Sequence, residues 1–78
     1  MGNNHFPVID TVATGTNIKR LFLERNLTVG DVQRHFGFES PRTVYNWTSG
    51  KSLPNIDNLY ALSYLLDVTI NEILVSKN

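Results

Sequence analysis

The chain has 78 residues, equal numbers of acidic and basic side chains, and no cysteine. A chain of this size buries roughly 60% of its unfolded surface, which predicts one domain with a single modest core. Neither a disulfide framework nor a thiolate metal site is available, so stability has to come from packing. No apolar run reaches the roughly 20 residues of a membrane span, and no signal-peptide pattern opens the chain. We therefore expect a cytoplasmic globular protein with no membrane association.

The first residues differ from the rest of the chain. Residues 1–13 contain Pro7 and a β-branched run but no helical period, which predicts a short irregular N-terminal arm. A helical domain is expected over residues 14–78.

The first helix is expected from a cap at Thr14 or Thr16 to a stop at Asn26. Its apolar residues at helical spacing are Ile18, Leu21, Phe22 and Leu23. A second helix is expected from Thr28, with Asp31 completing a capping box, to Gly37, which suits a left-handed C-terminus. The side chains on its inner face are Val29, Val32 and Phe36.

A third short helix is expected in the stretch "SPRTVYNWTSG". Ser40 is a good N-cap, Pro41 suits the first helical position because its missing N–H is not needed there, and Gly50 marks the end.

Two further helices complete the pattern. The fourth is expected to begin at Asn55 or Asp57 and to end at Asp67, and its apolar stripe is Ile56, Leu59, Leu62, Leu65 and Leu66. The last is short, with Thr69 and Glu72 spaced as a capping box. Five helices with no strand predict an all-α bundle.

The second and third helices, joined by a tight turn, have the outline of a helix-turn-helix. On the third helix Val44 and Trp47 share the inner face because they are three residues apart. The side chains left for the outer surface are Arg42, Thr43, Tyr45, Asn46 and Ser49.

That outer set suits a DNA major groove. Arg42 can donate two hydrogen bonds to guanine, Asn46 can pair with adenine, and Thr43 can offer a hydroxyl or a methyl group. The side chains suited to sugar and phosphate are Tyr45, Ser49 and Lys51. The alternative is an ordinary solvated polar face, which is the default for any exposed helix.

An ordered series of features favours the DNA interpretation: "LTVGDVQRHFG", "SPRTVYNW", "SGKSLPNIDNL" and "ALSYLLDVTINEIL". With them the chain, from about residue 17 to 75, resembles the lambda-repressor-like, Cro/C1-type (XRE) helix-turn-helix family. The resemblance implies a five-helix fold that binds double-stranded DNA. The base-contacting residues it implies are Arg42, Thr43 and Asn46. The backbone-contacting residues that we expect are Thr28, Ser40, Tyr45, Ser49 and Lys51.

The sequence departs from the family pattern at three places. Val29 stands where many members have a glutamine that contacts phosphate, and the turn before Pro41 looks one residue longer than in the shortest phage repressors. Phe22 and Thr48 stand where many members pair an arginine with a glutamate. Because both positions have changed together, an apolar contact is expected in place of the ion pair.

Charge is unevenly distributed. Residues 19–51 hold six basic and three acidic side chains, whereas residues 52–78 hold one basic and three acidic side chains. This asymmetry suits a protein that places its basic half on DNA and turns its acidic half away. Because one copy would neutralise few phosphates, tight binding is expected to need two copies or a partner. Candidate dimer surfaces are Tyr60 and Tyr64 on the fourth helix and the apolar last helix, with packing at the rim of the core as the alternative for the tyrosines.

Catalysis is not expected. His5 and His35 lack a second ligand at metal spacing, and no nucleophile, cofactor motif or glycine-rich phosphate loop is present. Neither a cofactor, a metal ion nor a small-molecule substrate is therefore expected. The function predicted is that of a DNA-binding transcriptional regulator, a repressor acting as a homodimer. The alternative is an antitoxin-like or anti-regulator module that binds another protein, which the zero net charge supports.

Overall fold

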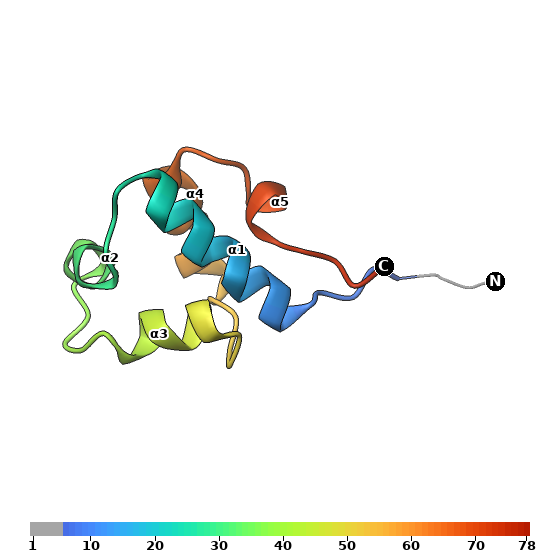
Figure 1. The fold of residues 1–78 in the computed structure, drawn as a ribbon, viewed down its shortest axis with the longest axis horizontal. Coiled ribbons are helices and arrows are strands. Elements are labelled where there is room, and N and C mark those ends of the chain that lie inside the picture. The colour runs from blue at the N-terminus through green and yellow to red at the C-terminus, as the bar shows by residue number, and fades with distance from the viewer. Residues whose placement is uncertain (1–5) are drawn as a thin grey trace.

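The computed structural model describes residues 6–78, which form five helices joined by short loops (Figure 1). The helices are α1 (Thr11–Glu24), α2 (Val29–Phe36), α3 (Arg42–Ser49), α4 (Ile56–Leu66) and α5 (Ile70–Ile73). Within these residues the only β-structure is one isolated antiparallel bridge between Ile9 and Ser76. The all-α, five-helix prediction is confirmed.

The helix boundaries with strong local signals lie where the sequence placed them. Thr28 and Asp31 form a capping box at the start of α2, and Gly37 ends that helix with φ at +73°. Thr69 and Glu72 form a second capping box on α5. Each box satisfies backbone N–H groups that have no partner inside a helix.

Two helix starts differ from the prediction. α1 begins at Thr11 with Asp10 as its cap, whereas a cap at Thr14 or Thr16 was expected. Thr14 is instead fully buried, and its hydroxyl oxygen accepts a hydrogen bond of 2.9 Å from the N–H of Val75. α3 begins one residue late, so the Ser40 hydroxyl accepts from the N–H of Arg42 at 3.3 Å from just outside the helix.

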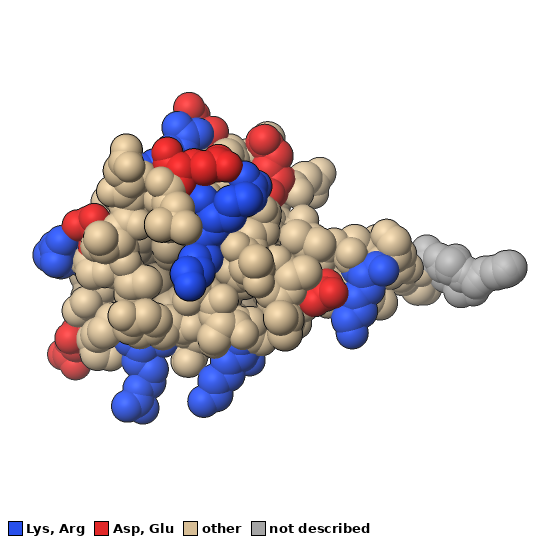
Figure 2. All heavy atoms as spheres, viewed as in Figure 1, with Lys and Arg blue, Asp and Glu red and all other residues tan. Residues whose placement is uncertain are grey.

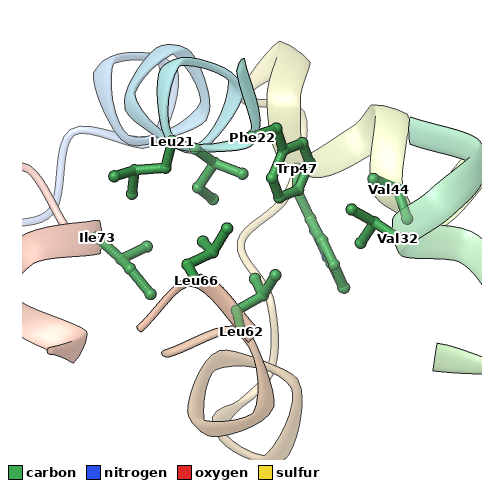
Figure 3. Close-up of a cluster of buried hydrophobic side chains, with 9 residues drawn as sticks. Leu21, Phe22, Val32, Val44, Trp47, Leu62, Leu66 and Ile73 are labelled. Atoms are coloured by element: carbon green, nitrogen blue, oxygen red, sulfur yellow. The ribbon is translucent and has the colours of Figure 1, made fainter. Parts of the chain in front are cut away.

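The core lies between α1, α3 and α4, and it also receives side chains from α2 and α5 (Figure 3). Its buried apolar residues are Ile18, Leu21, Phe22, Val32, Val44, Trp47, Leu62, Leu66 and Ile73. Two residues expected on inner stripes are exposed instead of buried. Leu23 is 68% exposed and Ile56 is 82% exposed, so the apolar pattern assigned the wrong side to both.

An unusually close approach joins α1 to α3. A Cβ atom added to Gly15 would lie 2.5 Å from the carbonyl oxygen of Trp47, and one added to Gly50 would lie 2.5 Å from the Cα of Val12. Such distances exclude any larger side chain unless the backbone moves. The two glycines therefore set how closely α3 lies against α1.

The segments that flank the helices, residues 8–10 and 75–77, pair with each other beside the bundle (Figure 1). The N–H of Asp10 donates to the carbonyl of Val75, and the N–H of Lys77 donates to the carbonyl of Val8, both at 2.8 Å. The expected N-terminal arm lies partly outside the described residues, since the structure describes none of residues 1–5.

Candidate DNA-binding site

The two sides of α3 have opposite character. Val44 and Trp47 are 0% and 2% exposed, so this side is buried in the core. The predicted contact residues on its other side are exposed, except Asn46, which is half-buried. Along the lower edge of the molecule in Figure 2, where α3 runs in Figure 1, the projecting charged side chains are basic. α3 therefore presents a polar, basic surface from a rigid apolar base.

An aromatic cluster holds the inner side of α3. The indole of Trp47 meets the rings of Phe36 and Phe38 edge-to-face, with centroid distances of 5.5 and 5.9 Å. Phe36 and Phe38 in turn stack on each other at 5.3 Å. Such contacts add to the stabilisation from burial. Phe38 lies in the turn between α2 and α3, and no role was predicted for it from the sequence. Because its ring contacts Trp47, the turn itself helps to fix the orientation of α3.

The outer surface contains a shallow hollow of about 350 Å³, lined by Ser40, Pro41, Arg42, Tyr45 and Asn46. Four of the eight predicted contact residues therefore lie together. Arg42, Tyr45 and Asn46 share one face because they are three and four residues apart. Thr43 is exposed but does not line this hollow.

Two of the three side chains expected to contact bases, Arg42 and Asn46, have unused hydrogen-bonding groups. Among residues 6–78, the Arg42 guanidinium makes no ion pair, and no hydrogen bond engages the Asn46 side-chain amide. The backbone carbonyl of Asn46, by contrast, accepts from the N–H groups of Lys51 and Ser52, at 3.0 and 3.2 Å. This holds the position of Asn46 while its amide stays available to a ligand.

The last residue of α3 and the loop that follows it carry the remaining predicted backbone contacts on that side. Ser49 is exposed, and its hydroxyl donates to the carbonyl of Asn46 at 3.3 Å. Gly50 adopts φ of +78°, which turns the chain sharply, and the exposed Lys51 follows it. A cation at this place can meet phosphate without base specificity.

Thr28, the predicted phosphate contact at the start of α2, lies beside the carboxylate of Asp31. The N–H of Thr28 donates to the Asp31 carboxylate at 2.9 Å, and this bond keeps the pKa of Asp31 below its usual value. Arg34 pairs with the same carboxylate at 2.5 Å and lowers the pKa further. A phosphate at the start of α2 would therefore meet a carboxylate that Arg34 partly neutralises. Sequence reasoning identified the capping box but not this electrostatic consequence.

Phe22 and Thr48, which stand at the positions of the family's ion pair, line one groove of about 250 Å³ between α1, α2 and α3. Most of its lining is apolar, and Tyr45 borders it from α3. The Thr48 hydroxyl donates to the Tyr45 carbonyl at 3.2 Å. An apolar contact between Phe22 and Thr48 in place of the ion pair stays a prediction.

Metal sites and membrane-spanning helices are two further features to consider in the described residues. In the part of the chain that the structure describes, no three His, Cys, Asp or Glu side chains gather as metal ligands would. Among the same residues, none of the helices has both the length and the apolar character that crossing a bilayer requires. His35 lies exposed at the end of α2 beside Phe36, and His5 lies outside the described residues.

Comparison with protein-family models matches a helix-turn-helix family over residues 18–73. The chain belongs to the Cro/C1-type (XRE) helix-turn-helix family. Membership implies DNA binding and a role in transcription regulation, in a family whose members are typically not enzymes. Searches of curated proteins and of solved structures give no significant match.

Proposed function

We propose that this protein binds double-stranded DNA sequence-specifically and represses transcription as a homodimer that occludes the promoter. α3 enters the major groove, where Arg42, Thr43 and Asn46 contact base edges. The residues that position the protein on sugar and phosphate are Thr28, Ser40, Tyr45, Ser49 and Lys51. The protein works in the cytoplasm, without a cofactor, a small-molecule substrate or a catalytic activity.

One observation carries this proposal. The side chains of Arg42 and Asn46 stand one helical turn apart, beside the same hollow, with their donors unused within the described residues. A guanidinium and a carboxamide are the groups that most often make bidentate contacts with guanine and adenine. The buried Trp47 fixes the helix beneath them. This preorganisation lowers the entropy lost on binding.

Substitution of these two residues tests the proposal. Preferred duplexes are first selected from random DNA, and Arg42→Ala and Asn46→Ala are then compared with the parent by electrophoretic mobility shift. Each variant is expected to lose about 1–3 kcal/mol of discrimination at one base position. The fold should persist because both side chains lie outside the apolar core.

Matched controls separate the loss of a base contact from the loss of any exposed arginine or asparagine. Arg25→Ala removes an exposed arginine from the end of α1, and Asn71→Ala removes an exposed asparagine from α5. Both controls should keep the sequence preference. A protein-interaction module would show neither a preferred DNA sequence nor stronger DNA binding at lower salt, which the DNA proposal requires. That result would overturn the proposal.

A further inference from the structure

α4 is apolar on two sides, which a helix at the surface of a monomer does not need. Its inner side contributes the fully buried Leu62 and Leu66 to the core. Its outer side exposes Ile56 by 82%, Tyr60 by 57% and Tyr64 by 74%. Large apolar and aromatic side chains exposed on successive turns of one helix form a contiguous patch, and such patches mark interaction surfaces. Something outside this chain is therefore expected to cover the outer side.

We propose that the stripe formed by Ile56, Tyr60 and Tyr64, called here the tyrosine stripe, is the surface through which two copies of this chain pair. The biological role of this pairing rests on the DNA-binding function proposed above. The surface itself can be tested without DNA.

The spacing of the stripe makes it self-complementary. Ile56 and Tyr64 each lie four residues from Tyr60, so they occupy successive turns of one helix face. When two α4 helices pack antiparallel about a two-fold axis at Tyr60, Ile56 of each copy meets Tyr64 of the other. A two-fold interface requires this reciprocity.

The charges around the stripe agree with a second copy. No charged side chain belongs to the stripe, so it does not call for a basic or acidic partner. The nearest acids in sequence are Asp57 and Asp67, at the two ends of α4. In the antiparallel arrangement Asp57 of one copy lies level with position 63 of the other, and Asp67 lies level with position 53, so no two carboxylates are opposed.

The tyrosines are already ordered for contact. The Tyr60 hydroxyl donates to that of Tyr64 at 3.2 Å, and the rings meet edge-to-face with centroids 5.0 Å apart. The hydrogen bond to Tyr64 raises the pKa of Tyr60 above its ordinary value. Tyrosine is enriched at interfaces because it gives a large contact area at a small cost in conformational entropy.

The size of the stripe indicates a weak dimer. It consists of the side chains Ile56, Tyr60 and Tyr64, whereas each side of a standard interface contributes roughly 20–30 residues. Pairing through α4 alone is therefore partial in free solution. Two copies bound to adjacent half-sites on DNA have a high effective concentration for each other, so the pairing becomes complete there.

The test measures self-association without DNA. Sedimentation equilibrium compares the parent chain with Tyr64→Ser, with Ile56→Ser and with the control Leu23→Ser, which removes an exposed apolar residue from α1. The parent should dimerise, each stripe variant should raise the dimer Kd by about tenfold or more, and the control should match the parent. Circular dichroism of each variant verifies that it remains folded.

Cross-linking gives a second readout, since the chain has no native cysteine. A residue on a two-fold axis meets its own copy, so Tyr60→Cys should form disulfide dimers on mild oxidation far faster than Leu23→Cys. A parent that stays monomeric at millimolar concentration overturns the inference. Equal Kd values for parent and stripe variants, or equal cross-linking at positions 60 and 23, do the same.

The two proposals fail separately. If the stripe is not a self-association surface, the parent still binds a single DNA half-site through α3, and Tyr64→Ser changes nothing on two half-sites. If the DNA proposal is wrong, the dimer Kd and the cross-linking pattern stand while sequence preference is absent.

Discussion

The helices α3 and α4 bury one side each in the same core, but they expose opposite kinds of surface. α3 places Val44 and Trp47 inside and polar groups outside, whereas α4 places Leu62 and Leu66 inside and apolar rings outside. The buried sides of the two helices play the same part, since both supply apolar side chains to one core cluster. What differs is the ligand that each outer face suits: base edges and phosphate for α3, and an apolar helix for α4. We propose that the outer faces determine what each helix binds, while the inner faces hold the helices in place.

Removing the inner anchor of α3 should have the largest effect. Trp47→Ala is expected to lower the free energy of unfolding by about 3–5 kcal/mol, because a large buried ring is replaced by a cavity. Tyr45→Ala, on the outer side of the same helix, should change it by no more than about 0.5 kcal/mol. Urea unfolding at neutral pH measures both. Similar losses for the two variants would contradict the division of α3 into an inner and an outer side.

The close approach of α1 and α3 predicts the next largest effect. Gly15→Ala should destabilise the fold by about 1–3 kcal/mol, because its Cβ would press on the backbone of α3. The matched control is Gly30→Ala in α2, where the nearest atom to a new Cβ is 3.4 Å away on the flexible Arg34 side chain. That variant should be neutral or stabilising by up to about 1 kcal/mol, since alanine favours helix. Thermal unfolding of both, with the parent, checks the sign of each change.

A smaller effect is expected at the helix ends. Thr28→Ala removes the cap of α2 and should cost about 1 kcal/mol. Thr28 is also a proposed phosphate contact, so DNA affinity should fall by a similar factor for every sequence, while sequence preference remains because the α3 surface that we propose to read bases is untouched. A urea titration measures the cost, and a DNA shift assay at saturating protein checks that sequence preference remains. Loss of sequence preference in a folded Thr28→Ala would mean that the start of α2 takes part in readout.

The smallest effect is a dependence of stability on pH. The N–H groups of Thr28 and Thr69 hold the pKa values of Asp31 and Glu72 below their ordinary values of 3.8 and 4.5. The stability that these carboxylates give is complete above their unfolded pKa values, and it is lost as pH falls through their lower folded values. Unfolding free energy should therefore decrease below about pH 4. Asp31→Asn should weaken this dependence, and an unchanged slope would contradict the role of the capping box.

The sequence predicted the helix-turn-helix well because its signals are local. The boxes at Thr28 and Thr69 and the left-handed Gly37 depend on residues within one helical turn. Trp47 was correctly assigned to the core because it shares a helix face with Val44. Such features need no knowledge of distant contacts.

What the sequence did not predict depends on contacts between distant segments. Gly15 lies in the middle of α1, where glycine weakens a helix, and only the backbone of α3 explains it. Ile56 follows the apolar period but lies in the first turn of α4, beyond the edge of the core. Asp10 caps α1, but the β-branched residues that follow it hide the start of the helix.

The central claim is that the outer side of α3 meets DNA and the outer side of α4 does not. An NMR titration of the labelled protein with a single half-site duplex at low ionic strength tests it most directly. We predict that the side-chain signals of Arg42 and Asn46 shift on binding while those of Ile56 stay in place. Shifts confined to the tyrosine stripe, with Arg42 and Asn46 unmoved, would contradict the account.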